Sequence, residues 1–280
     1  MSEPRRPMRA GAQPVPDTPV ASEGLRDEKS GAEILPGAEP FSAEGGPHGV
    51  LVVHGFTGSP QSLRGLAQAF AAAGFAVELP LLPGHGTTVE DMAKTGWDDW
   101  SSAAEAAYQE LAGRCDRMVV AGLSMGGTLA VWLATRHPEV AGMVAVNPAI
   151  DPPAPSFIEM MQGALDAGTE FMPAVGNDIA DPRETELAYD AVPVRAMISL
   201  ISQGQALYDD LGKITCPVLI LNSPQDHVVP PVSSDVLAAK VSGPVERVTL
   251  ERSYHVATLD YDKDEIEARA VEFARKVTSD

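Results

Sequence analysis

Short runs dominated by apolar residues recur along most of this chain. Several of them, such as Val50-Leu51-Val52-Val53, contain no polar residue at all. A continuous apolar run is typical of a strand that is buried on both faces of a sheet, since a half-exposed strand would alternate apolar and polar residues. The runs predict strands at residues 49–53, 75–79, 118–121, 143–146, 218–221 and 245–250.

Segments with helical spacing lie between several of these predicted strands. Apolar residues recur at three- and four-residue intervals over 63–71, and Gly74 is placed to end that helix. Residues 128–134 and 262–277 have the same helical character. Strands that alternate with helices predict an α/β fold, with a mostly parallel central sheet flanked by helices.

One interval breaks this alternation. Between Asn147 and Thr215 there is no strand-like run, and Pro, Met and short helical fragments take its place. A long insertion inside a compact domain usually has a function. We therefore expect a small helical cap at about residues 149–212. Its Met and Leu side chains fit either an apolar pocket or an ordinary core.

Residues 1–40 differ from the rest in composition, because they are rich in Pro, Gly, Ala and Glu and lack periodic apolar positions. Such a segment does not bury enough apolar surface to offset its ordering entropy, so we predict a flexible tail followed by one domain over 41–280. No apolar run is long enough to cross a bilayer, which argues against membrane insertion. Arg5-Arg6 is not followed by an apolar stretch, which favours a cytoplasmic location over export.

The formal net charge of the 280 residues is −19, from 20 Lys and Arg against 39 Asp and Glu. This balance argues against nucleic acid as a partner and against anionic membranes, since both need a basic surface. The two cysteines, Cys115 and Cys216, each precede an apolar run and have no metal-ligand spacing. We expect free thiols, no metal and no cofactor, whereas the oligomeric state is not predicted by the sequence.

The strongest chemical motif is Gly122-Leu123-Ser124-Met125-Gly126, a Gly-x-Ser-x-Gly sequence between the predicted strand at 118–121 and the helix at 128–134. This context identifies a nucleophile elbow, in which a sharp strand-to-helix turn exposes the serine hydroxyl. Glycines two residues before and after Ser124 remove the Cβ atoms that would clash in such a turn. A five-residue pattern alone also fits an ordinary glycine-rich turn, and the flanking strand and helix favour the elbow.

A serine nucleophile needs a general base, and six histidines compete for that role. His255 follows the last predicted strand and precedes the last helix, so its loop lies at the carboxyl edge of the sheet. The usual order of Ser, then Asp or Glu, then His along such chains also favours His255. We interpret His54 as a structural residue that holds the loop after the first strand, and His85 as part of a turn.

The same order favours Asp226 as the acid that orients His255, because Asp226 follows the strand at 218–221. Asp151, which follows the strand at 143–146, is the rival candidate. Two backbone N–H groups are expected to stabilise the oxyanion: Met125, directly after the candidate nucleophile, and Phe56, directly after His54-Gly55.

With these residues in place, the chain resembles the α/β-hydrolases, and more narrowly the small bacterial carboxylesterases and monoacylglycerol lipases. The resemblance covers about residue 41 to the C-terminus. It implies an α/β-hydrolase fold with a cap, a triad of Ser124, Asp226 and His255, and oxyanion donors at Phe56 and Met125. The motifs that carry it are His54-Gly55-Phe56-Thr57-Gly58, Gly84-His85-Gly86, Thr95-Gly96-Trp97-Asp98-Asp99-Trp100, Gly122-Leu123-Ser124-Met125-Gly126-Gly127 and His255-Val256-Ala257-Thr258-Leu259-Asp260.

The function expected from these residues is hydrolysis of carboxylic esters with short to medium acyl chains, possible substrates including monoacylglycerols, through an acyl-enzyme on Ser124. The partner is then a small ester or lipid molecule. One alternative is an aminopeptidase or another amide or thioester hydrolase, in which the cap carboxylates of Glu159, Asp166 or Glu170 hold a substrate amine. A second is a catalytically silent binding protein of the same fold, although no triad residue is missing. An aspartate-nucleophile hydrolase is disfavoured because the elbow carries serine.

Overall fold

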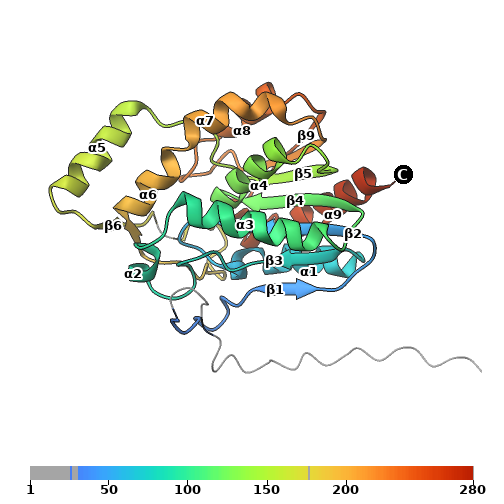
Figure 1. Ribbon diagram of the computed structural model, residues 1–280, viewed down its shortest axis with the longest axis horizontal. Coiled ribbons are helices and arrows are strands. Elements are labelled where there is room, and N and C mark those ends of the chain that lie inside the picture. Colours follow the sequence, from blue (N-terminus) through green and yellow to red (C-terminus); the bar gives the residue numbers. More distant parts are fainter. Residues whose placement is uncertain (1–25, 27–30, 176, 280) are drawn as a thin grey trace, which may run out of the picture.

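A seven-stranded sheet forms the centre of the computed structural model, which describes residues 26, 31–175 and 177–279 (Figure 1). The strands are β1 (Phe41–Ala43), β2 (His48–Val53), β3 (Ala76–Leu79), β4 (Arg117–Leu123), β5 (Gly142–Val146), β8 (Val218–Asn222) and β9 (Val245–Thr249). Their order is β1-β3-β2-β4-β5-β8-β9, and every neighbouring pair is parallel except β1 with β3. The predicted mostly parallel sheet is therefore confirmed, and the short antiparallel edge strand β1 is an addition to it.

Helices cover both faces of the sheet, which explains why its strands read as continuous apolar runs. On β2, Leu51 and Val53 belong to the core on one face, and the alternate residue Val52 belongs to the core on the other. One face carries α1 (Arg64–Ala72) and α9 (Lys263–Thr278), and the opposite face carries α3 (Trp97–Ala112), α4 (Met125–Arg136) and α8 (Val232–Lys240). Two short helices, η1 (Pro60–Leu63) and α2 (Val89–Met92), and the turn η3 (Ala257–Leu259) lie in the connections.

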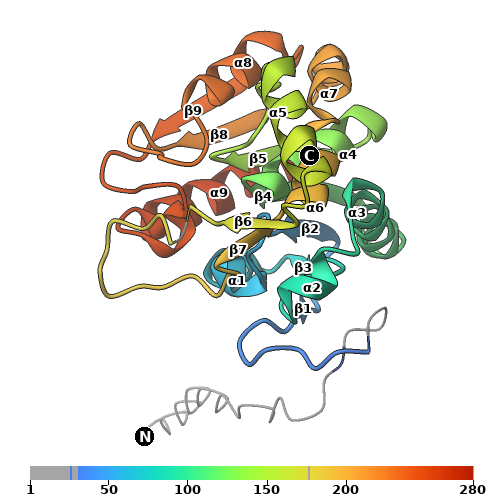
Figure 2. The same ribbon diagram turned by 90° about the vertical axis from the view of Figure 1, so that its left-hand side faces the viewer.

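The cap lies beyond the carboxyl ends of the parallel strands (Figure 1), on the side of the molecule that Figure 2 presents to the viewer. It contains α5 (Pro155–Asp166), β6 (Phe171–Pro173), β7 (Ala191–Pro193), α6 (Val194–Ile201), α7 (Gly204–Asp210) and η2 (Leu211–Lys213). The sequence predicts only helices here, and in this respect it is wrong, because β6 and β7 form a two-stranded antiparallel sheet. Three residues per strand are too few to produce a recognisable alternation.

The segment before β1 packs on the sheet domain where the structure describes it. Ile34 and Ala38 are buried, and the Leu35 N–H donates to the Gly86 carbonyl at 2.8 Å. The rest of the predicted tail, residues 1–25 and 27–30, lies outside the described residues, so the extent of the tail stays a prediction. Among the helices of the described chain, none is long and apolar enough to span a bilayer.

Candidate active site

Ser124 occupies the turn between β4 and α4 in a backbone conformation that L-residues rarely adopt. Its φ is 56° and its ψ is −120°. This strain, of order 1–3 kcal/mol, persists because the turn is fixed on both sides. The Ser124 N–H donates to the Val146 carbonyl at 3.0 Å, and its own carbonyl accepts from the Thr128 N–H at 3.0 Å. The turn has the geometry that the sequence predicts for a nucleophile elbow.

The two glycines of the motif are required by close packing. A Cβ atom at Gly122 would lie 2.1 Å from the Gly126 oxygen, and one at Gly126 would lie 1.9 Å from the Val53 oxygen. Both distances are far below van der Waals contact, so only glycine lets β4, α4 and the end of β2 approach this closely. Gly55, on the neighbouring loop, has the Ser124 Cβ 3.5 Å from where its own Cβ would lie. The loop after β2 therefore packs directly against the serine.

Loops from β8 and β9 bring Asp226 and His255 together. The His255 Nδ1–H donates to Asp226 Oδ2 at 2.7 Å, and the side chains are only 8% and 2% exposed. The other carboxylate oxygen of Asp226 accepts the N–H groups of Val228 and Val229, each at 2.8 Å. Three hydrogen bonds therefore fix the position of this buried carboxylate.

Asp151, the rival acid, takes a different position. Its side chain is exposed at the rim of the same cavity, and its backbone N–H donates to Ser233 Oγ at 3.1 Å. The imidazole ring of His255 is hydrogen-bonded to Asp226 and not to Asp151. The geometry thus pairs the two residues that chain order favours.

Asn147 joins the two loops, and the sequence analysis gave it no role. Its Nδ2 donates to the His255 carbonyl at 2.8 Å and to Ser223 Oγ at 3.1 Å, and its Oδ1 accepts the Ser223 N–H at 2.8 Å. The residue is buried and has a positive φ of 42°. Its signal in the sequence is a polar residue directly after the apolar strand β5, at the carboxyl edge of the sheet.

Two further buried carboxylates fold the loop that carries His255. Asp260 accepts the N–H of Tyr254 at 2.9 Å, and Asp262 accepts the N–H of Arg252 at 2.9 Å. Neither is predicted as a site residue by the sequence, in which Asp260 is only the last residue of the motif at 255–260. Both act through the backbone of the loop rather than at the cavity.

The loop that carries Phe56 rests on two buried histidines. His54 Nε2 accepts the Leu82 N–H at 3.1 Å, which leaves the proton on Nδ1 to donate to the Gly55 carbonyl at 3.0 Å. Burial, with a smaller contribution from His85, lowers the pKa of His54 to about 3, and burial lowers that of His85 to about 4. Both rings are therefore neutral at pH 7. The structural role expected for His54 agrees with this arrangement.

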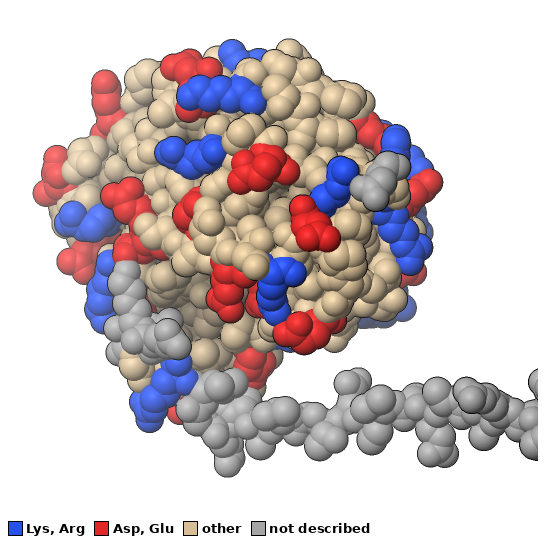
Figure 3. Space-filling view, turned by 45° about the vertical axis from the view of Figure 1, so that its right-hand side comes forward, with Lys and Arg blue, Asp and Glu red and all other residues tan. Residues whose placement is uncertain are grey.

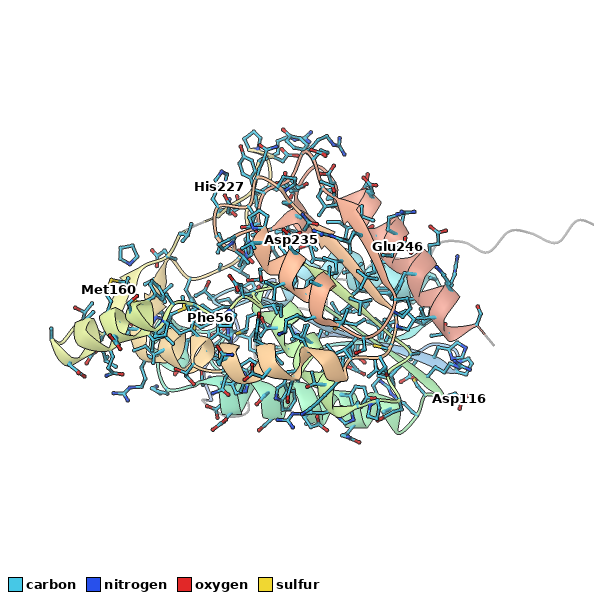
Figure 4. All side chains as sticks on the ribbon, turned by 90° about the horizontal axis from the view of Figure 1, so that it is seen from above. Phe56, Asp116, Met160, His227, Asp235 and Glu246 are labelled. Carbon is cyan, nitrogen blue, oxygen red and sulfur yellow. The ribbon has the colours of Figure 1, made fainter. Side chains whose placement is uncertain are left out.

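A cavity of about 730 Å³ opens between the cap and the sheet domain, and Ser124, His255, Phe56 and Met125 all line it. Figure 4 shows Phe56 close to the centre of the molecule and Met160 far out on α5. Most of the wall is apolar, and its charged side chains among the described residues are three carboxylates, those of Asp151, Glu186 and Asp190. Burial raises the pKa of Glu186 to about 7, although His255 and Ser62 act in the opposite direction.

The cap carboxylates considered for binding a substrate amine lie elsewhere. Glu159, Asp166 and Glu170, all within the described cap, are exposed and stand outside the cavity lining. Cys115 and Cys216 are free thiols. In the described parts of the chain, no three His, Cys, Asp or Glu side chains are grouped so that they could hold a metal ion.

The surface carries charges of both signs. On the face that Figure 3 presents, acidic and basic side chains alternate with wide uncharged areas and do not form one basic patch. The molecule as a whole remains strongly acidic, at −19. Neither feature provides the continuous positive footprint that binding to phosphates needs.

Comparison with known proteins places these observations in a family. The family described as serine aminopeptidase, S33, matches residues 47–262. A thermostable monoacylglycerol lipase from Bacillus sp. (strain H-257) is 45% identical over 247 residues, which are 87% of this chain and 96% of the relative. A carboxylesterase from Bacillus subtilis (strain 168) is 26% identical over 85% of this chain and 97% of the relative.

The same relationship holds for the three-dimensional structure. A solved structure from work on two metagenome-derived lipolytic enzymes, LipS and LipT, superposes with a TM-score of 0.83 at 44% identity, over 87% of this chain and 99% of that one. The residues of the family match include every strand from β2 to β9 and the elbow at Ser124. This chain therefore belongs to the serine aminopeptidase S33 family of α/β-hydrolase enzymes.

Proposed function

We propose that this enzyme hydrolyses carboxylic esters with short to medium acyl chains, monoacylglycerols among them, through an acyl-enzyme on Ser124. The observation that carries the proposal is the buried hydrogen bond between His255 and Asp226, together with the position of His255 in the wall of the cavity that Ser124 also lines. The relatives named as monoacylglycerol lipase and carboxylesterase support the substrate class.

His255 acts as the general base in this proposal. Because Nδ1 is engaged by Asp226, Nε2 is the nitrogen left to accept the Ser124 proton when the hydroxyl attacks the ester carbonyl. The same nitrogen then protonates the leaving alcohol. Water attacks the acyl-enzyme by the reverse sequence, and Asp226 stabilises the imidazolium in both halves of the reaction.

The backbone N–H groups of Phe56 and Met125 are the proposed oxyanion donors. Met125 is the first residue of α4, a helix of 12 residues, so its N–H is directed out of the helix N-terminus, where the dipole also favours negative charge. Gly55 packs against Ser124 and keeps the Phe56 loop beside it. His54, through its hydrogen bonds to the Leu82 N–H and the Gly55 carbonyl, fixes the position of that loop.

The cavity has an apolar side and a polar side, and each fits one part of a monoacylglycerol. Met197 and Ile201 on α6 provide an apolar wall for the acyl chain. Asn177, Glu186 and Asp190, from the segment between β6 and β7, provide polar groups for the hydroxyls of the alcohol. A cavity lined this way binds neutral amphipathic esters by burying the chain and leaving the alcohol hydrogen-bonded.

Hydrolysis of amino-acyl amides is the second candidate. It draws support from the family description and from the carboxylates of Asp151, Glu186 and Asp190, which are placed to attract an amine. Thioesters would use the same serine, and a silent binding protein would not react at all. The cytoplasmic location stays a prediction from the sequence.

The test uses the purified protein and a matched panel of glycerol esters, simple esters, thioesters and amino-acyl amides. We expect ester hydrolysis and covalent labelling by a fluorophosphonate, and we expect Ser124→Ala to remove both, with at least a ~1000-fold loss in kcat. Turnover of amino-acyl amides without esters would select the second candidate. A protein that neither labels nor hydrolyses any of the four classes would be the silent binder.

A further inference from the structure

Asp178, a carboxylate from the cap, contacts both loops that carry the proposed base and acid. It lies between β6 and β7, more than forty residues before either loop in the chain. Its Oδ2 accepts the backbone N–H of His255 at 3.0 Å and that of His227 at 3.1 Å. The side chain of Asp178 is 10% exposed.

The remaining contacts of Asp178 reinforce this arrangement. Its Oδ1 accepts from Nδ1 of His227 at 2.8 Å, and its carbonyl accepts the Val256 N–H at 3.1 Å. Figure 4 shows His227 on the loop beside the segment that links β6 to β7. One cap residue is thus bound to the residue after Asp226, to His255 and to the residue after His255.

The contact between the cap segment and the loop of His255 is reciprocal. Asp260, on the His255 side, accepts the N–H groups of Ala180 at 2.7 Å and Asp181 at 3.0 Å. Carboxylates therefore bind backbone N–H groups in both directions across the same junction. Hydrogen bonds to a charged acceptor are stronger than those between neutral groups, so this junction is tightly held.

We propose that Asp178 is a positioning residue, which fixes the loops of His255 and Asp226 relative to each other and thereby couples the cap to the reaction centre. The inference rests on the proposed function, in which His255 must meet Asp226 on one side and Ser124 on the other. Asp178 acts through the backbone of His255 and touches neither the substrate nor the reacting atoms. A displacement of about 1 Å at such a base costs on the order of 100-fold in rate.

Two substitutions distinguish this role from simple support of the fold. Asp178→Ala leaves the N–H groups of His255 and His227 without their acceptor, and we expect kcat to fall by about 10- to 100-fold with KM nearly unchanged. Asp178→Asn keeps one amide oxygen that accepts both N–H groups, so it recovers most of the lost rate. Asp209→Asn is the matched control, because the exposed Asp209 side chain on α7 accepts from Gln205 rather than from either loop, and it keeps the wild-type rate.

A spectroscopic measurement gives a second, independent readout. The proton shared between His255 and Asp226 gives a downfield NMR signal, identified by its loss in His255→Ala, and we expect it to shift or broaden in Asp178→Ala but not in Asp209→Asn. Circular dichroism confirms that each variant is folded. If Asp178→Ala keeps the wild-type kcat and signal, or raises KM alone, the positioning role is wrong. The proposed function fails separately, if Ser124→Ala remains active.

Discussion

The central sheet and the cap are stabilised in different ways. β2, β4, β5 and β8 are covered by helices on both faces, and almost every side chain they carry is buried. In the cap, α5 buries one side chain, that of Met161, and exposes Phe157 at 41% and Met160 at 57%. The sheet therefore has little freedom to rearrange, whereas the outer cap has few contacts that resist movement.

The inner part of the cap differs from its outer part. Residues 177–187 are bound to the sheet domain at several points, including Asp178 to His255 and the Leu187 N–H to Gln61 at 2.9 Å. Ser59 Oγ also donates to the Leu187 carbonyl at 3.0 Å. The two regions therefore have different roles. The sheet domain and the inner cap hold the reacting groups, and α5 and α6 shape the space for the substrate.

The largest change in stability and activity is expected from adding a single methyl group at the elbow, by the substitution Gly126→Ala. Gly126→Ala places a Cβ 1.9 Å from the Val53 oxygen, in a region where no neighbour is able to yield. We expect a loss of several kcal/mol in the free energy of unfolding and, in the remaining folded protein, a fall in kcat/KM of about 1000-fold or more, since Ser124 and the Met125 N–H both shift.

The matched control is Gly163→Ala in α5, where a Cβ would have no neighbour within 4 Å. Alanine is a better residue than glycine inside a helix, so this variant gains about 0.5–1 kcal/mol in stability and keeps its activity. Urea unfolding and steady-state kinetics on both variants measure the difference. Equal effects at the two positions would contradict the contrast between sheet and cap.

The second prediction concerns acid sensitivity of the sheet domain. His54 and His85 have pKa values of about 3 and about 4 in the folded state, below the ordinary histidine value of 6.5 that applies when the chain unfolds. The unfolded chain therefore binds more protons below pH 6.5, and the stability that the neutral rings contribute is full above that pH. It is lost as pH falls through 6.5 towards the folded pKa values, by up to about 1.4 kcal/mol per pH unit for each ring.

The contribution of His85 to this pH dependence is measured by urea unfolding, which compares the free energy of unfolding of wild type with that of His85→Asn over this pH range. Glu186, whose raised pKa of about 7 acts in the opposite direction, affects both proteins alike and cancels in the difference. We expect the advantage of wild type over the variant to shrink steadily as pH falls from 6.5 to 4. Gln205→Asn, an exchange between two uncharged side chains at an exposed position of α7, serves as the control and leaves the slope unchanged. A difference that does not vary with pH would show that His85 is not held neutral.

The contrast also explains how far the sequence predicts this structure. The buried strands carry their own signal, since both faces demand apolar residues, and each predicted parallel strand is present. Ser124 directly follows β4, and Asp226 and His255 lie in the loops after β8 and β9, so chain order alone predicts that the three residues meet at one edge of the sheet. β6 and β7 have only three residues each, so no local pattern of apolar and polar residues predicts them.

Asp178 is the clearest case of what the sequence does not predict. It lies in Asn177-Asp178-Ile179-Ala180-Asp181, where an aspartate is common in any turn. Its role depends on backbone N–H groups that come from two distant loops and exist as donors at that point only after the chain has folded. Asn147 differs in this respect, because its place directly after a strand was a signal that could have been used.

The smallest expected effect is on selectivity, and it tests the part assigned to the cap. Ile201 lies on α6 and lines the apolar side of the cavity. Ile201→Trp shortens the space for an acyl chain without contact with His255 or Asp226. We expect the ratio of kcat/KM for the longest to the shortest ester of a series to fall about 10-fold, with the rate for the shortest ester nearly unchanged.

The control for this change is Met160→Trp on α5, which is 57% exposed and lies outside the cavity lining, so it leaves the ratio as in wild type. If Ile201→Trp lowers the rate for every chain length equally, α6 is part of the reaction centre and the division between sheet domain and outer cap fails. If both variants change the ratio, the acyl chain extends past the described cavity to the surface of α5. Only a change confined to Ile201→Trp and to long chains supports an acyl wall formed by α6, because a wall limits substrate length without altering the reacting groups.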